Sequence, residues 1–457
     1  MRKRQLSIGV TIALMAITAA LTLTLTYQYA MNRFNQQVKN VTERQKMYAK
    51  LYQIDTKTRS KFLFDIDETK LNDTIANGYV SGLGDAYSRY LSTAECTQLQ
   101  QQLNGKSVGI GIEFAMNTAQ EARITRVIAG SPAAVAGVQK NDCIVAVNGQ
   151  NVSDWSEQQI ADALSGDNGV EVTLTVARLD ELGIMGEQIY TMTRSLYDLV
   201  TVESRMMAEN IGYIRIYQFS THTDEEFSAS LEKLVQSGVT ALVLDLRNNG
   251  GGTLESAANI LNQLLPAGNL MYAADADGKK TVLYTSDSAQ STLPLNVLIN
   301  ENTASAAEAV AAAIRDYERG TIMGMTSYGK GTVQELYTFT DGSGLSLSTA
   351  YFVSPFGGGF HQVGITPDIR VELNYAGSLD LLSESADAQL SAAIRKLKQE
   401  APTDEPVDDP TVSGESESGA ESGAESEGTE SGAQSEATGS AVSAIGMEPG
   451  CADATRA

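Results

Sequence analysis

Residues 239–266 read VTALVLDLRNNGGGTLESAANILNQLLP, and they decide the fold. The apolar run ending at Leu246 predicts a buried strand, the three glycines at 250–252 predict a tight turn, and the apolar spacing from Leu254 predicts a helix. Just upstream, IGYIRIYQF (211–219) is strand-like and DEEFSASLEKLVQSG (224–238) is an amphipathic helix. Strands that alternate with helices pair in parallel through right-handed crossovers, so this stretch predicts an α/β domain.

The same alternation continues toward the C-terminus. LNVLIN (295–300) and TIMGM (321–325) are strand-like, an alanine-rich helix lies between them, and residues 334–353 resemble a hairpin. We therefore predict one α/β domain over residues 191–395.

Short strand-like runs, bounded by turn residues, mark a separate module earlier in the chain. SVGIGIEF (107–114), EARITRVIA (121–129), DCIVAVNG (142–149) and VEVTLTVARL (170–179) are short strand-like runs, and SEQQIADALSG (156–166) is helical. They predict a β-rich domain over residues 101–190. We expect its first strand and its helix to border a groove in which a peptide adds as a strand, while the backbone amides of the glycine-rich turn hold the terminal carboxylate of that peptide. The turn residues are Gly109, Ile110, Gly111 and Ile112.

At the N-terminus, a short positively charged stretch is followed directly by a long uncharged, apolar stretch. MRKRQ carries three positive charges, and residues 6–26 carry none over 21 positions, which as a helix spans about 30 Å, the thickness of one bilayer. We predict a cytoplasmic flank and a single-pass anchor over residues 1–30 and a helical region over 31–100, with the remaining chain outside the cytoplasm. A cleaved signal peptide is the alternative, since its apolar part needs only about 7 to 15 residues.

Charge and cysteine content exclude several classes of function. The net charge of -23 argues against nucleic acid as a partner, because phosphate binding requires clustered Lys and Arg. Thirteen acidic residues face one basic residue, Arg456, between positions 401 and 457, which predicts a disordered acidic tail over 396–457. The three cysteines lie far apart without a CxxC pair, so neither a disulfide framework nor a metal site is indicated.

A serine and a lysine are the candidate chemical groups. Ser305 precedes the alanine-rich helix 306–314, and Lys330 stands between two glycines. The chain has only two histidines, His222 and His361, without recognisable acid partners, so we disfavour a Ser-His-Asp triad and interpret both as solvent-facing or capping residues. A lysine has a pKa of about 10.4, but burial penalises its charged form and allows it to act as a general base.

Neighbouring groups complete this candidate site. Gln334 follows Lys330 by four residues and is expected to orient the amine without adding a charge that would retain the proton. The amides of Gly251 or Gly252, at the strand-to-helix turn, and of Ala306, at its own helix start, are candidates for holding a tetrahedral oxyanion. The alternatives are that Ser305 only caps its helix and that Lys330 is a surface residue. We interpret Asp245 and Arg247 as structural.

These motifs resemble a known family when they are combined. DLRNNGGG (245–252), TASAAEAVAAAI (303–314) and YGKGTVQ (328–334), with GLGDAYSRYLS (82–92) and GITPDIRVE (364–372), resemble the carboxyl-terminal processing peptidases, also called tail-specific proteases. GSPAAVAGVQKNDCIVAVNGQNV (130–152) resembles a PDZ domain. The resemblance implies a core similar to the ClpP and crotonase folds. It also implies Ser305 as nucleophile, Lys330 as base and Gln334 as its support, without a metal or organic cofactor.

The resemblance also carries expectations about partners. It implies a membrane-anchored serine endopeptidase that cleaves extracytoplasmic proteins near their C-termini, with the PDZ domain binding substrate tails or gating the site. The helical segment 31–95 is a candidate for pairing with a second copy as a homodimer, while the oligomeric state stays open at this point; the expected location is the bacterial cell membrane. Two other functions stay open at this point: a PDZ scaffold whose peptidase core is inactive, and a regulatory protease dedicated to one target.

Overall fold

The structure is a computed structural model, and it describes residues 8–179, 184–287, 290–373, 375 and 377–400. The described chain divides after residue 72 into two compact units. The predicted acidic tail lies outside the described residues from position 401 onward.

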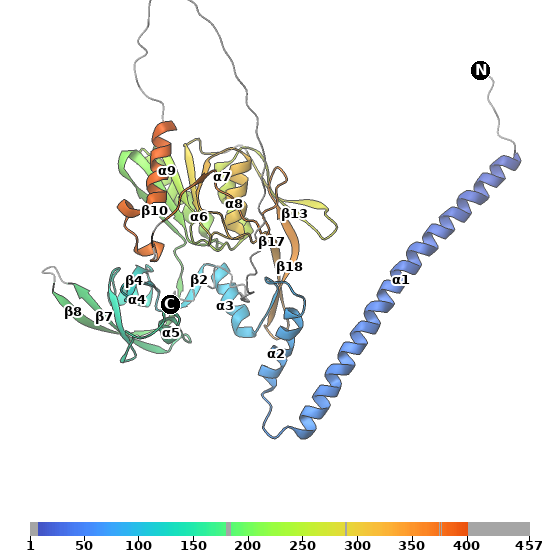
Figure 1. Cartoon of the computed structure of the whole chain (residues 1–457), viewed down its shortest axis with the longest axis horizontal. Helices are drawn as coiled ribbons and strands as arrows, with labels where there is room; N and C mark the ends of the chain where they lie inside the picture. The colour runs from blue at the N-terminus through green and yellow to red at the C-terminus, as the bar shows by residue number, and fades with distance from the viewer. Residues whose placement is uncertain (1–7, 180–183, 288–289, 374, 376, 401–457) are drawn as a thin grey trace, which may run out of the picture. The chain divides into compact units, whose positions relative to one another are not determined.

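The first unit is dominated by one helix. Helix α1 (Ile8–Lys61) is continuous over 54 residues, so the predicted membrane segment and the polar segment after it form a single element (Figure 1). Within the described residues, Ile12–Asn35 is the one stretch of helix with the length and composition to cross a membrane, a property it shares with signal sequences. Helix α2 (Glu68–Ser81) begins at the end of this unit.

The second unit contains the predicted α/β domain. Its six-stranded sheet has the order β10-β11-β12-β15-β16-β19. The strands are β10 (Val202–Met206), β11 (Ile211–Ile216), β12 (Ala241–Asp245), β15 (Leu295–Ile299), β16 (Thr321–Gly324) and β19 (Ile369–Arg370). All neighbours pair in parallel except β10, which adds antiparallel to β11. The parallel pairing predicted from the strand and helix alternation is therefore confirmed.

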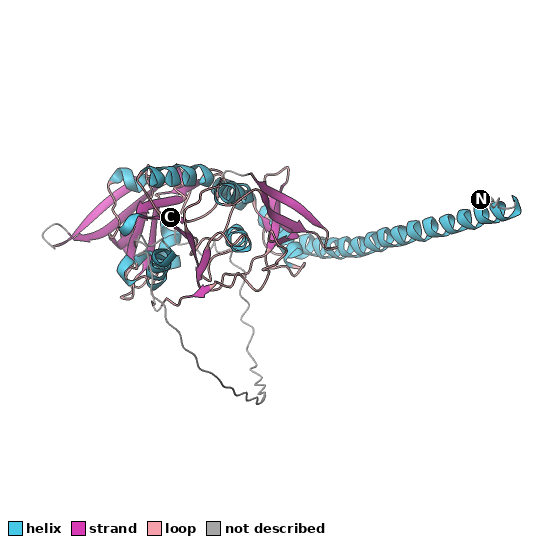
Figure 2. Ribbon diagram, turned by 90° about the horizontal axis from the view of Figure 1, so that it is seen from above, coloured by secondary structure: helices cyan, strands magenta, loops and turns pink. Residues whose placement is uncertain are grey.

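Helices cover both faces of this sheet (Figures 1 and 2). Alternate residues of β12 face opposite sides: Leu242 and Leu244 pack with α6 (Thr223–Gln236), α7 (Leu254–Leu264) and α8 (Ala306–Asp316), whereas Val243 packs with α9 (Ala388–Glu400). Because both faces are buried, the strand is apolar from Ala241 to Leu244, as a central parallel strand should be, and only its last residue, Asp245, is charged.

A second sheet was only partly anticipated. Its order is β1-β18-β13-β14, with β17 also paired to β18. The hairpin of β17 (Thr332–Thr338) and β18 (Gly344–Val353) matches the prediction for 334–353. The hairpin of β13 (Gly268–Ala274) and β14 (Lys280–Ser286), and strand β1 (Arg89–Leu91) inside the region expected to be helical, were missed. Helix α3 (Thr93–Leu103) follows β1 directly.

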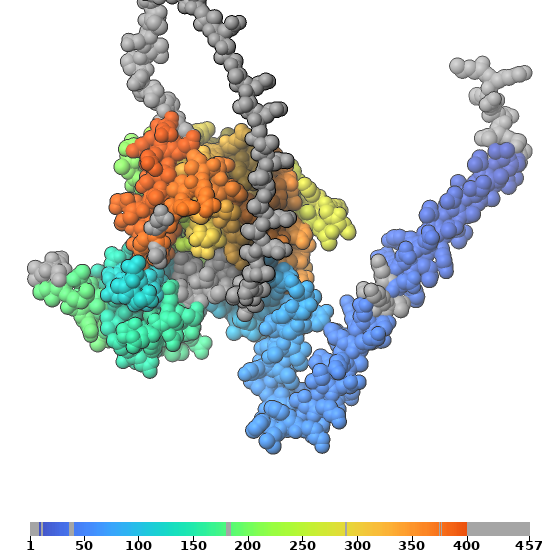
Figure 3. Space-filling view, viewed as in Figure 1, coloured from blue at the N-terminus to red at the C-terminus, as the bar shows by residue number. Residues whose placement is uncertain are grey.

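The β-rich module has its own sheet and its own apolar core. The sheet order is β3-β4-β5-β7-β8, with β6 on β5. Its strands are β3 (Ile112–Met116), β4 (Ala122–Val127), β5 (Cys143–Val147), β6 (Gln150–Asn151), β7 (Glu171–Leu179) and β8 (Met185–Thr193), and its helices are α4 (Pro132–Ala136) and α5 (Glu157–Leu164). These residues gather in one lobe in Figure 3. Strand β3 is at the edge of this sheet, and no strand among the described residues pairs with its outer side.

The predicted strand at 107–114 is in fact two strands of different sheets. Strand β2 (Lys106–Gly109) pairs with β9 (Ser195–Asp198), whereas β3 belongs to the module. The chain turns between them at Gly111, whose φ of 77° is left-handed and whose added Cβ would lie 2.1 Å from the Ser131 Cβ. Only glycine satisfies both conditions.

Candidate active site

The backbone of Ser305 is strained. Ser305 is the N-cap residue of α8, with φ 56° and ψ -119°. The serines that cap α3, α4 and α5, which are Ser92, Ser131 and Ser156, all have negative φ, the ordinary geometry of a capping residue. A non-glycine residue in such a conformation persists only where its surroundings enforce it, and such positions cluster at functional sites.

The carboxylate of Glu308 joins the serine to the lysine. Its Oε2 accepts the backbone amides of Ser305 at 2.9 Å and of Lys330 at 2.8 Å. The two amides therefore lie within two hydrogen-bond lengths of each other, although the residues are far apart in sequence. Its Oε1 accepts the Gly329 amide and the Ser327 hydroxyl, both at 2.6 Å. Four donors on one buried carboxylate fix the lysine loop against the start of α8.

Glu308 is fully buried, and burial raises its pKa above the ordinary 4.5 although the four hydrogen bonds act in the opposite direction. The Ser327 hydroxyl also accepts the Ile365 amide at 2.6 Å, and the Gln362 amide donates to the Gly329 carbonyl at 2.8 Å. The segment around 360–365 thus supports the lysine loop from its other side.

Ser305, Lys330 and Gln334 line one cavity of about 190 Å³. Lys330 is only 5% exposed, so the interpretation as a surface residue is wrong. The remaining wall comes from α3, residues 217–219, the glycine turn with the start of α7, and the β17–β18 hairpin; its apolar side chains are those of Leu99, Leu103, Phe219, Leu254, Val333, Leu336 and Phe352. A cavity of this kind suits an apolar side chain of an extended polypeptide.

Gln334 is oriented by two hydroxyl groups. Its side-chain Nε2 donates to Thr332 Oγ1 at 2.7 Å and to Ser348 Oγ at 3.1 Å. With its amide nitrogen engaged in this way, the carbonyl oxygen is the end that remains to accept a hydrogen bond.

The glycine turn lies directly against Ser305. A Cβ added to Gly251, whose φ is 101°, would lie 2.8 Å from the Ser305 Cβ and 3.0 Å from the Ala306 nitrogen. The Gly251 amide donates to Asn249 Oδ1 at 2.8 Å. Because the Gly251 amide already donates this bond, it is not available to an oxyanion. Of the predicted oxyanion donors, the amides of Gly252 and Ala306 remain.

The same turn pairs with a neighbouring segment. The Phe219 amide donates to the Gly251 carbonyl, and the Thr253 amide donates to the Phe219 carbonyl, both at 2.8 Å. A Cβ on Gly252 would lie 1.9 Å from the Phe219 carbonyl oxygen. Position 252 therefore requires glycine, because only glycine permits this approach.

The four predicted peptide-binding residues lie in the module and its entry strand, and none of them lines the serine cavity. Gly109 ends β2, and Ile112 begins the edge strand β3. The carbonyls of Ile110 and Gly111 accept the amides of Ala133 at 2.8 Å and of Ile128 at 2.9 Å. These bonds hold the turn beside α4.

The interpretation of His361 as a solvent-facing or capping residue is wrong. Its ring packs against Tyr87 and Tyr351, with centroids 6.0 and 5.3 Å away, and a Cβ added to Gly331 would lie 2.5 Å from the His361 nitrogen. The packing of His361 could not be predicted from the sequence, because its contacts join segments that are remote in the chain. Glu308 was also missed, although its spacing of three from Ser305 is that of a capping box.

Metal ligands are not grouped in the part of the chain that the structure describes: no three His, Cys, Asp or Glu side chains there come together as a possible ion site.

Comparison with known proteins identifies the domains of this chain. Residues 210–371 match peptidase family S41, and residues 123–178 match the PDZ domain. The carboxyl-terminal-processing protease of Synechocystis sp. is 32% identical over 320 residues, covering 69% of this chain and 74% of the relative. The carboxy-terminal processing protease CtpA of Bacillus subtilis is 31% identical over 373 residues, covering 81% and 78%.

A solved structure supports the fold. The crystal structure of a putative S41 protease from Bacteroides fragilis superposes with a TM-score of 0.51 at 19% identity, covering 71% of this chain and 90% of that one. With a strained serine, a buried lysine and a PDZ module in one chain, and with relatives of this extent, the protein belongs to the carboxyl-terminal processing proteases of peptidase family S41 and is a serine peptidase.

Proposed function

We propose that this protein is a membrane-anchored endopeptidase that cleaves extracytoplasmic polypeptides near their C-termini with a Ser305–Lys330 dyad. The observation that carries the proposal is the Glu308 carboxylate, which binds the backbone amides of both residues at the edge of one cavity.

The reaction begins with proton transfer. Uncharged Lys330 takes the Ser305 Oγ proton, the freed oxygen pair attacks the peptide carbonyl carbon, and the carbonyl π pair moves to its oxygen. The amides of Gly252 and Ala306 donate to that oxyanion. The lysine then gives its proton to the leaving amine as the acyl-enzyme forms, and water repeats the sequence to release the product acid.

Gln334 fits a supporting role for the base. Its carbonyl oxygen is the free end of the side chain, since the amide nitrogen is held by Thr332 and Ser348. A neutral acceptor orients the amine without the fixed negative charge that would keep it protonated.

The test uses the full chain in detergent with β-casein as an unfolded substrate. Ser305→Ala and Lys330→Ala are each expected to abolish cleavage, with unchanged thermal unfolding. Cleavage that survives Lys330→Ala would exclude the lysine as base, and cleavage that survives Ser305→Ala would exclude the serine as nucleophile.

The placement of the enzyme and the role of the PDZ domain belong to the same proposal. The apolar part of α1 and its positive flank support a single-pass anchor in a bacterial cell membrane with the catalytic domain outside the cytoplasm. The open edge of β3 and the amides around Gly109 to Ile112 support capture of a substrate C-terminus. We also propose that the helical segment 31–95 pairs with a second copy.

A further inference from the structure

The Lys330 amine lies over an aromatic ring that comes from a distant segment. Its Nζ is 5.5 Å from the centroid of Tyr87, within the range in which a cation interacts with the face of a ring. Tyr87 belongs to the segment between α2 and β1, about 240 residues earlier in the chain. A contact between segments so far apart depends on the tertiary fold and not on local geometry.

The segment that carries Tyr87 is fixed in place. Asp85 accepts the backbone amides of Tyr87 at 3.2 Å and of Ser88 at 2.9 Å. The Ser88 hydroxyl accepts the Ser348 amide at 3.0 Å, and β1 continues the anchoring by pairing with β18. The Tyr87 backbone is therefore attached to the same hairpin that carries Gln334.

The ring is also braced from the side. His361 contacts Tyr87 edge to face, with an angle of 66° between the rings, and His361 in turn packs against Tyr351. Burial, the neighbouring Tyr328 and the Glu308 carboxylate raise the pKa of Tyr87 to about 12. The Lys330 amine lies over the face of this ring, 5.5 Å from the centroid.

We propose that Tyr87 is a positioning residue that holds the Lys330 side chain and stabilises the ammonium formed when Lys330 accepts the Ser305 proton. This inference rests on the proposed dyad. A carboxylate in the same place would hold the lysine permanently charged, whereas a ring face stabilises the ammonium more weakly and leaves the amine able to give its proton to the leaving group.

The test compares variants of the full chain in detergent on a short fluorogenic peptide across pH. Tyr87→Phe keeps the ring face and is expected to retain the wild-type profile. Tyr87→Leu removes it and is expected to lower kcat by about 3- to 30-fold. The acidic limb of kcat/KM should move to lower pH by about 0.4 to 1.5 units, because the charged amine has lost a stabilising contact. KM should change little, since Tyr87 does not line the cavity.

Matched controls separate this role from folding. Tyr90→Leu removes a nearby tyrosine, in β1, whose hydroxyl donates to Asp73 at 2.8 Å, and it should leave the pH profile unchanged. If Tyr87→Leu does not fold, Tyr87→Met fills the space without a ring and takes its place in the comparison.

Three results would overturn the inference: an unmoved acidic limb in the Leu or Met variant, an effect confined to KM, or an equal loss in Tyr87→Phe. Failure of the dyad itself is recognised separately, because Lys330→Ala would then retain turnover. An inactive Lys330→Ala beside an unaffected Tyr87→Leu would reject only the role of the ring.

Discussion

At the scale of single residues, the site is defined by close packing around Ser305. Glu308 holds it from within α8, and Gly251 lies against its Cβ. Neither residue takes part in bond making in the proposed mechanism. Each is nonetheless expected to control turnover, because a displacement of about 1 Å between reacting groups costs on the order of a hundredfold in rate.

Replacing Glu308 tests whether its hydrogen bonds to the Ser305 and Lys330 amides hold the nucleophile and the base together. Glu308→Gln substitutes an amide nitrogen for one carboxylate oxygen. The new donor then faces either the amides of Ser305 and Lys330 or the Gly329 amide and the Ser327 hydroxyl. We expect the free energy of unfolding to fall by about 2–4 kcal/mol and kcat to fall at least about tenfold. Chemical denaturation and casein cleavage measure both quantities. Glu301→Gln, on the exposed loop nearby, is the control, and an active, stable Glu308→Gln would contradict the role assigned to the carboxylate.

Crowding at the glycine turn gives a second test at this scale. Gly251→Ala places a methyl group 2.9 Å from the Ala304 carbonyl oxygen as well as against Ser305. Gly149→Ala has a similar positive φ of 75° but open space around its Cβ, so it reports backbone strain alone. We expect Gly149→Ala to lose about 1 kcal/mol of stability and Gly251→Ala to lose more, and only Gly251→Ala to lose activity beyond the detection limit of the assay. Equal activity in the two variants would show that the packing is not needed.

At the scale of elements, α9 closes the second face of the parallel sheet through a buried ionic junction. Arg247, 2% exposed, donates to Asp245 at the end of β12 and to Asp387 before α9. Asp387 also accepts the Leu390 amide at 3.0 Å. The interpretation of Asp245 and Arg247 as structural residues fits this geometry, and the junction places Leu390 against the core.

Breaking that junction should loosen α9. Asp387→Asn leaves a buried guanidinium short of one carboxylate, and we expect the free energy of unfolding to fall by about 3 kcal/mol. Asp277→Asn, on an exposed turn, should change it by less than about 0.5 kcal/mol. Urea denaturation followed by circular dichroism measures the difference. An unchanged midpoint in Asp387→Asn would show that α9 is held by its apolar face alone.

The same junction predicts a pH dependence. Burial alone would raise the pKa of Asp245, but Arg247 outweighs it and holds that pKa below 3.8. Because the folded pKa is depressed, the stability that Asp245 contributes is complete above pH 3.8 and is lost as pH falls through the lower folded value. Asp245→Asn should therefore be less stable than the wild type at neutral pH, and the difference should shrink as pH falls below 3.8. A constant difference between the two proteins across this range would contradict the assignment.

The elements also show where prediction from sequence succeeds. Each strand and helix of the parallel sheet from β11 to β16 appears in the hydrophobic pattern, because both depend on local periodicity. The β13–β14 hairpin was missed, and β1 was expected to be helical, because a three-residue strand has too short a pattern to identify. In the site, Ser305 and Lys330 were found by motif. Glu308 and Tyr87 were not, since their importance depends on contacts with remote residues.

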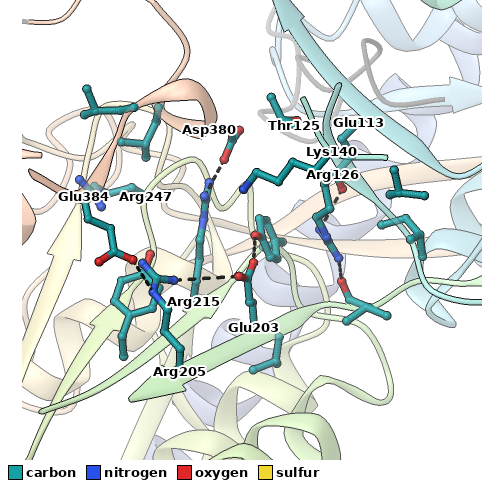
Figure 4. A pocket seen from close by; sticks show the side chains of 18 of the residues that line it. Glu113, Thr125, Arg126, Lys140, Glu203, Arg205, Arg215, Arg247, Asp380 and Glu384 are labelled. Carbon is teal, nitrogen blue, oxygen red and sulfur yellow. Dashed lines mark hydrogen bonds and ion pairs between the residues drawn. The ribbon is translucent and has the colours of Figure 1, made fainter. Parts of the chain in front are cut away.

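At the scale of the whole second unit, the PDZ module borders the catalytic domain around a cavity of about 670 Å³ (Figure 4). Arg126 from β4 bonds Glu113 at 2.9 Å and the Val200 carbonyl, and its guanidinium lies 4.0 Å from the centroid of Tyr217. Arg215 lies 4.5 Å from the same ring. Tyr217 also lines the cavity of Ser305, so it is a direct physical connection between the two regions.

The module is inserted at one point of the catalytic domain, which makes its removal a clean experiment. Gly109 and Ser195 are partners in the β2–β9 ladder, so replacing residues 110–194 with an Asn-Gly turn should convert that ladder into a hairpin. The apolar core of the module is separate from the cores of the catalytic domain, so the remainder should still unfold cooperatively.

We expect the deleted protein to cleave a short unstructured peptide but to lose its preference for a substrate with a free C-terminal carboxylate over the amidated form. Loss of charge-assisted bonds to that carboxylate corresponds to about 10- to 150-fold in preference. Competition between the two peptides for the full chain and for the deleted protein measures it, with Ser305→Ala as the inactive control. If the deleted protein folds and keeps the preference, the carboxylate is read by the catalytic domain and the PDZ groove has another role.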